Sequence, residues 1–541
     1  MQVFRVIDGY ESAGHLLKLL SEHFDVRFEP GTRGDLEAAT PAPAGGNPQP
    51  PAFSVLAPSG DVFSVILPGE QRPFEGAASV RFANGDGLDA PLRGQRLRTP
   101  EAAEAFGLGG GDAHEVLAWV EEQPIWTAQK TGGRIWHRTS VPLPALVPGR
   151  QLSEFLNGEY FLKLLPLYHF VRRTVGDDGW ASPPLRGSVI IDDPNLHARS
   201  YGRLDYPRLL QFVRERNCHV AMATVPLDSW FVSGAAARIF RENVPWLSLI
   251  VHGNNHTRDE LAQPLDGDRA TVELAGALRR IGSLEVKSGV KVGRVMAPPH
   301  GVCAAGFMTA MMRLGFDGLT TNRWSLWKHN KLADRPASVG LGLADILAGG
   351  LPVVNRFRFN SVLCQAEIVI AAYLGQPLIA YGHHQDFDAN LEALSRTIDW
   401  INALGDVRWM SMAEVFRTNF RSRTLAALTQ VRMYSRRIKL VPPPATRQLE
   451  IQFPGFDAEI VPSIQVSEST AEGSRIRLCR AGEPVPVTGG NEIMVSLGDR
   501  GPVDYRSVAP NGRSVRVAVH RLAVEMRDRL TGLVPARAPL L

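Results

Sequence analysis

Between residues 187 and 420, short apolar runs repeatedly end in acidic or histidine side chains. A Val/Ile run of this length, bounded by turn residues, predicts a buried strand. Two adjacent carboxylates at a strand end are costly to bury unless a positive group lies beside them, and a metal ion is the simplest such group. The runs and the polar residues that follow them are 187–191 with Asp192 and Asp193, 246–251 with His252 and His256, and 378–382 with His383 and His384.

Segments with helical patterns separate these strands. Alternation of strands and helices indicates an α/β fold with a parallel sheet, either a β/α barrel or an open sheet, whose chemistry lies at the carboxyl ends of the strands. Further strands are predicted at 219–225, 292–296, 318–321 and 407–410, and helices at 207–216, 235–242, 307–314, 391–404 and 413–420.

The segments on either side have different hydrophobic patterns. A chain of 541 residues is expected to form about two to four domains. Residues 1–150 mix helix and hairpin patterns and predict an accessory α/β or β-rich domain, before the α/β domain at 151–430. Residues 431–541 predict a small antiparallel β domain, such as a sandwich, because 449–453, 475–478 and 514–519 alternate with period two between turns.

Composition excludes several classes of protein. The net charge of +4 is small and no Lys/Arg cluster is visible, so nucleic acid is not an expected partner. The four cysteines are scattered without a CxxC pair, which argues against a disulfide scaffold and a thiolate zinc site. No apolar stretch approaches the about 20 residues that a transmembrane segment needs. The first residues lack a secretory signal pattern, so a cytoplasmic location is expected.

In order and spacing, these motifs resemble those of the polysaccharide deacetylase (NodB homology) superfamily. That family has an Asp-Asp pair after its first strand, an HxxxH after its third, an Arg-Pro-Pro-Tyr-Gly-like loop and a late Leu-x-x-His. The corresponding segments here are Asp192-Asp193, His252–His256, Ala297-Pro298-Pro299-His300-Gly301 and Tyr381-Gly382-His383. The resemblance covers about residues 187–420. It implies a distorted (β/α) barrel and a metal-dependent hydrolase that removes an N-acetyl or other acyl group from an amino sugar of a polysaccharide or glycoconjugate.

One carboxylate and two imidazoles form a three-ligand site that leaves a coordination position open, as catalytic zinc sites do. The resemblance makes Asp193 the acidic ligand, beside His252 and His256. A divalent metal, with zinc as the first expectation, is therefore the predicted cofactor.

The resemblance also assigns the acid and the base. Asp192 is the expected general base, which takes a proton from water. His383 is the expected acid that protonates the leaving amine, and His384 stays an alternative because neighbouring residues of a strand point to opposite sides. Backbone N–H groups near His300 are expected to form part of an oxyanion hole.

The chain departs from the family at Ala297, where the family often has an arginine paired with the base. Either another cation pairs with Asp192, with Arg294 and Arg323 as candidates, or the basicity of Asp192 is set in a different way. The departure keeps open a second function, a non-catalytic carbohydrate-binding or assembly protein on the same barrel. A glycosidase with paired carboxylates ranks last, because adjacent acids at one strand end are poorly placed to flank a sugar bond from both faces.

Overall fold

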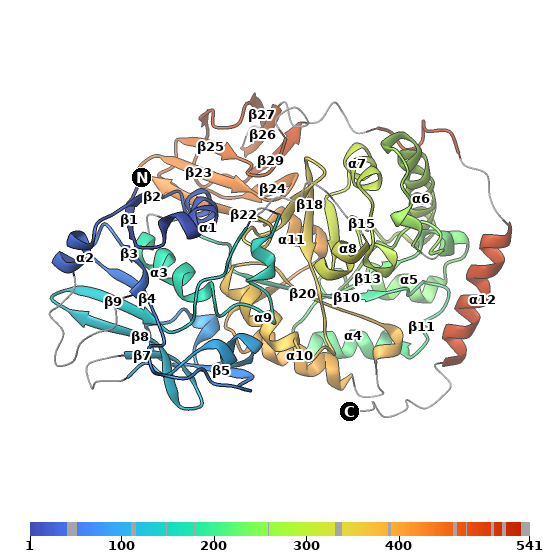
Figure 1. Ribbon diagram of the computed structural model, residues 1–541. Coiled ribbons are helices and arrows are strands. Elements are labelled where there is room, and N and C mark those ends of the chain that lie inside the picture. The colour runs from blue at the N-terminus through green and yellow to red at the C-terminus, as the bar shows by residue number, and fades with distance from the viewer. Residues whose placement is uncertain are drawn as a thin grey trace. The chain divides into compact units, whose positions relative to one another are not determined.

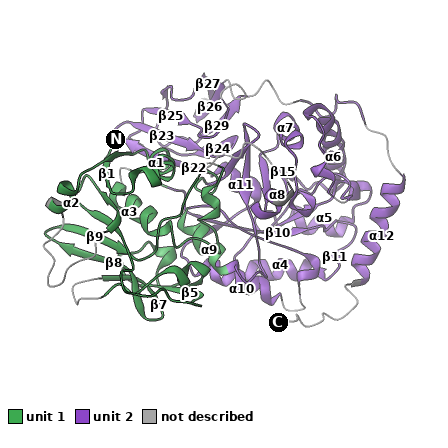
Figure 2. Cartoon of the chain, viewed as in Figure 1, with its two compact units in different colours: residues 1–181, 335–342, 365–374 green, residues 182–334, 343–364, 375–541 purple. Residues whose placement is uncertain are grey.

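The computed structural model describes residues 1–39, 51–109, 115–147, 149–176, 179–257, 259–329, 338–387, 391–457, 463–471, 473–498, 503–510 and 515–531. The chain forms two compact units (Figure 2). Unit 1 consists of residues 1–181, 335–342 and 365–374, and unit 2 of residues 182–334, 343–364 and 375–541. The three-domain division stays a prediction.

Unit 1 is built on a nine-stranded mixed sheet with helices beside it (Figure 1). The strand order is β2-β1-β3-β4-β9-β8-β7-β5-β6. Phe170 of helix α3 packs its ring against Phe4 and Phe63 of the sheet, and residues 165–171 of this helix are all buried, so its first two turns are enclosed in the core of unit 1. The elements are β1 (Val3–Ile7), α1 (Tyr10–Phe24), β2 (Arg27–Pro30), α2 (Arg33–Ala39), β3 (Pro51–Leu56), β4 (Val62–Ile66), β5 (Ser79–Phe82), β6 (Arg96–Arg98), β7 (Glu115–Val120), β8 (Gln123–Thr131), β9 (Arg134–Thr139), α3 (Leu165–Val175) and most of α9 (Cys364–Tyr373).

Unit 2 contains a ten-stranded, mainly parallel sheet that carries the predicted motifs. Its order is β17-β18-β16-β15-β14-β13-β10-β20-β19, with β21 also paired to β10, and only β17 is antiparallel to its neighbour. The strands are β10 (Leu185–Asp192), β13 (Val220–Thr224), β14 (Leu247–Val251), β15 (Val292–Met296), β16 (Gly318–Thr321), β17 (Asp345–Leu347), β18 (Leu351–Asn355), β19 (Phe357–Arg358), β20 (Leu378–His383) and β21 (Val407–Trp409).

Helices follow most of these strands, as the alternating pattern predicted. The helices are α4 (Tyr206–Glu215), α5 (Gly234–Arg241), α6 (Gly267–Ser288), α7 (Ala305–Arg313), α8 (Arg323–His329), α10 (Glu392–Asn402) and α11 (Met412–Arg417), and β11 (Ser200–Tyr201) pairs with β12 (Leu204–Asp205). The α/β class is therefore confirmed. The pairing among the described strands runs as an open path from β17 to β19, so the barrel stays a prediction.

Two four-stranded sheets form the β-rich part of unit 2. Their orders are β22-β23-β25-β28 and β24-β29-β26-β27, and buried side chains from both sheets form one core. The pair β23–β25 is parallel, so the expectation of a wholly antiparallel domain is wrong. The strands are β22 (Phe420–Leu425), β23 (Leu428–Met433), β24 (Arg437–Leu440), β25 (Gln448–Gln452), β26 (Ser463–Thr470), β27 (Gly473–Cys479), β28 (Val485–Pro486) and β29 (Ile493–Gly498).

The strand predicted at 514–519 is also wrong, because its described residues begin the helix α12 (Val515–Thr531). The period-two alternation there is coincidental. The side chains that α12 buries are Arg521, Glu525 and Asp528, which are spaced four and three residues apart on one helical face. In the described part of the chain, no helix has both the length and the apolar character needed to cross a membrane.

Candidate metal centre

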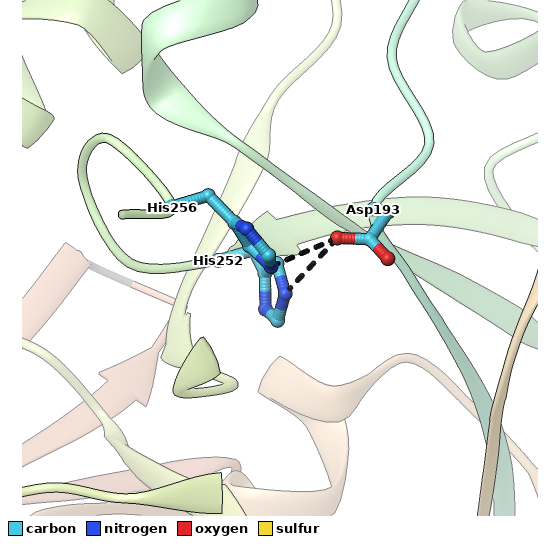
Figure 3. A group of neighbouring side chains, drawn as sticks. All are labelled: Asp193, His252 and His256. Carbon is cyan, nitrogen blue, oxygen red and sulfur yellow. Dashed lines mark ion pairs between the residues drawn. The ribbon is translucent and has the colours of Figure 1, made fainter. Parts of the chain in front are cut away.

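Asp193, His252 and His256 converge at the carboxyl ends of β10 and β14. Figure 3 shows both imidazole rings facing the Asp193 carboxylate. Oδ1 of Asp193 lies 3.0 Å from Nε2 of His256 and 3.5 Å from Nε2 of His252. One ligand atom from each residue can be chosen so that all three lie within 4.8 Å of one another. The structure thus brings together the three side chains that the sequence placed at the ends of two different strands.

The hydrogen bonding of His252 fits a metal ligand. Its Nδ1 lies 2.7 Å from the backbone carbonyl of Ala297. A carbonyl only accepts hydrogen bonds, so Nδ1 carries a hydrogen and donates it, and Nε2 is the ring nitrogen that faces Asp193. A backbone carbonyl in this position is a usual outer-shell partner of a metal-bound histidine.

Asp193 supplies the complementary negative charge. Burial raises the pKa of Asp193, but the neighbouring imidazoles of His252 and His256 outweigh burial and hold that pKa well below its usual value. Oδ1 of this ionised carboxylate is buried and makes no hydrogen bond with any described residue. A buried carboxylate oxygen without a hydrogen-bond partner is unfavourable unless a positive charge compensates it, as a bound cation would. The donor set therefore fits a divalent metal, and its O/N₂ composition suits zinc.

Two of the three residues have backbone conformations that side chains rarely adopt. Asp193 has φ 85° and His256 has φ 56°, both in the left-handed region. Such conformations cost about 1–3 kcal/mol each and cluster at functional sites. Glu260 holds the His252–His256 loop, because its carboxylate accepts the backbone N–H groups of Asn254 at 2.6 Å, Asn255 at 3.0 Å and His256 at 3.1 Å. Sequence reasoning missed Glu260, although an acid four residues after the second histidine was a visible signal.

Asp192 lies beside the three ligands and is held by Arg356. The guanidinium donates two parallel hydrogen bonds of 2.8 Å to the carboxylate, and both side chains are almost fully buried. Arg356 follows β18 and also covers the ring of Tyr381, 4.1 Å from its centroid. Burial raises the pKa of Asp192, but the charge of Arg356 outweighs burial and lowers that pKa, so the carboxylate is ionised at neutral pH.

Arg356 is the cation that pairs with Asp192 in place of the arginine missing at Ala297. Both candidates that the sequence suggested for this cation are wrong. Arg294 pairs with Glu285 at 3.0 Å, and Arg323 pairs with Asp345 at 2.5 Å. Arg356 is 164 residues away from Asp192 along the chain. It also follows β18, a strand that the sequence pattern did not reveal, so no local signal pointed to this arginine.

His383 is the histidine that lies beside Asp192. It ends β20, in register with Asp192 of β10, and its Nε2 is 4.0 Å from Oδ2 of that residue. Its Nδ1 is 3.7 Å from the Asp386 carboxylate, and 40% of its side chain is exposed. Burial lowers the pKa of His383, but the carboxylates of Asp386, Asp192 and Asp193 outweigh burial and raise it. These carboxylates thus favour the protonated form of His383 at the edge of the site.

His384 points away from Asp192, toward α12. Its side chain is 1% exposed, packs edge-on against Tyr201, and places Nε2 3.6 Å from Asp528 of α12. The geometry therefore favours His383 over His384 for the acid.

The loop after β15 contributes a backbone donor. The N–H groups of Gly301 and Val302 already donate to the carbonyls of Pro298 and Pro299, at 3.0 and 3.4 Å. This leaves the N–H of His300 as the loop's candidate for an oxyanion hole. The His300 ring lies 5.7 Å from the His256 ring, which places the loop next to the metal centre.

Comparison with known proteins gives only structural likenesses. No family model and no curated protein match the sequence. The solved structure of Agd3, described as a novel carbohydrate deacetylase, is 9% identical over 92% of this chain and 99% of that chain, with a TM-score of 0.45. A family 4 carbohydrate esterase from Streptomyces lividans in complex with acetate is 14% identical over 42% and 93% of the two chains, with a TM-score of 0.25.

A third likeness is to the catalytic domain of a peptidoglycan N-acetylglucosamine deacetylase from Eubacterium rectale. It is 9% identical over 43% of this chain and 92% of that chain, with a TM-score of 0.24. All three TM-scores are below 0.5, so these likenesses carry no weight for the function, which rests on the side chains of this chain.

Proposed function

We propose that this chain is a metal-dependent hydrolase that removes an N-acetyl or other acyl group from an amino sugar of a polysaccharide or glycoconjugate. The observation that supports it most is the convergence of Asp193, His252 and His256 beside an ionised Asp192 and beside His383, whose pKa is raised by neighbouring carboxylates. The substrate class rests on the motif resemblance. The proposal includes zinc as the metal and the distorted barrel as the fold that carries the site.

Each side chain has a role that its surroundings support. Asp193, His252 and His256 would hold the metal, which when bound supplies positive charge that polarises an amide carbonyl and lowers the pKa of water. Asp192 accepts the proton of the attacking water, and the arginine that pairs with it keeps it ionised and fixes its orientation. His383 gives its proton to the leaving amine.

The arginine also weakens the case for a non-catalytic carbohydrate-binding protein. That alternative was motivated by Ala297, which removes the cation expected next to the base. Arg356 supplies this cation from the position directly after β18, and both carboxylate oxygens of Asp192 accept its hydrogen bonds. A purely binding site has no need for an ionised, oriented carboxylate beside three metal-competent groups.

Acetate release tests the proposal. The full chain, incubated with oligomers of N-acetylglucosamine or N-acetylgalactosamine, is expected to release acetate. Chelation should stop the release and added zinc should restore it, because the metal is bound by only three protein groups and can be removed. Full activity after complete metal removal would reject the proposal. Glycan binding without acetate release would favour the binding protein, and new reducing ends would favour a glycosidase.

A further inference from the structure

The C-terminal helix α12 contacts the rest of unit 2 through buried charges. Arg521, Glu525 and Asp528 are only 3%, 5% and 2% exposed. The opposite face carries exposed apolar side chains, among them Val519 and Met526. The helix lies close to β11 in Figure 1, and Arg529 donates to the backbone of that strand. Its attachment is thus polar and directional, which suits positioning of neighbouring groups better than plain core packing does.

Arg521 reaches the loop that carries the acidic metal ligand. Its Nε and Nη2 donate to the buried carboxylate of Asp228, at 3.0 and 2.7 Å, and its Nη2 also donates to the backbone carbonyl of Asp193 at 3.4 Å. The same Asp228 carboxylate accepts a hydrogen bond of 3.1 Å from the side chain of Asn195. Arg521 and Asp228 therefore hold the segment 193–195 at two points.

This segment needs an external constraint. Asp193 has φ 85°, a conformation that persists only when its surroundings impose it. Its N–H donates to the carbonyl of Ala223 at 3.1 Å, and its carbonyl accepts from Arg521. The peptide groups on both sides of the Cα are thus fixed, which fixes the point from which the carboxylate extends toward His252 and His256.

We propose that Arg521 is a positioning residue that sets the metal affinity of the site by holding the backbone of Asp193. The inference rests on the proposed metal site and extends it to a helix 328 residues away along the chain. The guanidinium is needed because its fork reaches a carboxylate and a carbonyl at once, which the single ammonium of lysine does not reproduce.

Zinc affinity of the metal-free full-length chain tests this inference without any substrate. Competition with a chromophoric chelator gives the Kd for zinc in the wild type, Arg521→Lys and Arg521→Met. We expect both variants to bind zinc about 10- to 100-fold more weakly, the usual effect of losing an outer-shell partner. The lysine variant keeps a positive charge beside Asp228, so it is expected to fold even where the methionine variant does not.

Glu525→Gln is the matched control. It weakens another buried contact of α12, with His197 at 2.9 Å, and among the described residues no hydrogen bond joins Glu525 to Asp193. The control should lose some thermal stability and keep the wild-type Kd within about threefold. Wild-type zinc affinity in Arg521→Lys, or equal weakening in Glu525→Gln, would overturn the positioning role. Absence of zinc binding in the wild type would instead overturn the proposed function.

Discussion

Replacing His252 with alanine is expected to abolish zinc binding and to reduce acetate release to the uncatalysed rate. The change removes one of the three proposed protein ligands and leaves Asp193 facing only His256. Loss of an outer-shell partner already costs about 10- to 100-fold in affinity, so loss of a ligand should cost more than about 100-fold. Equilibrium dialysis against zinc, with acetate release assayed on the same samples, measures both effects.

His219→Ala is the matched control for this substitution. His219 is as buried as His252, at 1% exposure, but it immediately precedes β13 and contacts Pro245 and Ser248 rather than the candidate metal centre. Both variants create a cavity in unit 2 and should lose similar stability. Only His252→Ala should lose zinc, and retention of zinc and activity by that variant would contradict the assignment.

Arg356→Met is expected to be strongly destabilising and nearly inactive. It leaves the Asp192 carboxylate, which is 2% exposed, without its charge partner. Removing one member of a buried ion pair costs about 3–5 kcal/mol in the free energy of unfolding. With the arginine gone, burial raises the pKa of Asp192 and makes it a protonated, ineffective base, so the rate should fall by about 10²- to 10⁴-fold.

The stability that Arg356→Met loses should depend on pH, because the pKa of Asp192 shifts in opposite directions in the two proteins. In the wild type the lowered pKa of Asp192 contributes stability above the unfolded-state pKa, and that stability is lost as pH falls. In Arg356→Met the pKa of Asp192 is expected to be raised by burial, so Asp192 should make the folded protein less stable as the pH rises. The stability difference should therefore be large at pH 7 and shrink toward pH 4, as denaturant unfolding of the two proteins can measure.

Arg294→Met serves as the control for a generic loss of an arginine. Its ion pair with Glu285 is partly exposed, at 25% and 16%, so its loss should cost about 1 kcal/mol or less. Equal destabilisation by the two substitutions, or full activity of Arg356→Met, would show that Arg356 does not hold the base.

The sequence predicted those parts of the site that local patterns encode. Asp193, His252 and His256 were visible because each follows an apolar run at a strand end, and parallel strands bring such ends to one edge of a sheet. Arg356 could not be identified from the sequence, because its contact with Asp192 joins two segments that are far apart in the chain and meet only in the folded protein.

The C-terminal helix was missed for a different reason. Residues 515–519 alternate apolar and small or charged side chains, which imitates a strand, whereas the helix is held by the buried charges of Arg521, Glu525 and Asp528. Hydrophobic periodicity identifies the buried face only when that face is apolar. Here the apolar face of the helix is the exposed one, so the hydrophobic pattern did not indicate a helix.

Anomalous X-ray scattering at the zinc edge, from crystals of the chain loaded with one equivalent of zinc, tests the central claim most directly. The account predicts one strong peak about 2 Å from Oδ1 of Asp193 and from Nε2 of both His252 and His256. No peak among these three atoms, or a zinc ion bound elsewhere with this site empty, would contradict it.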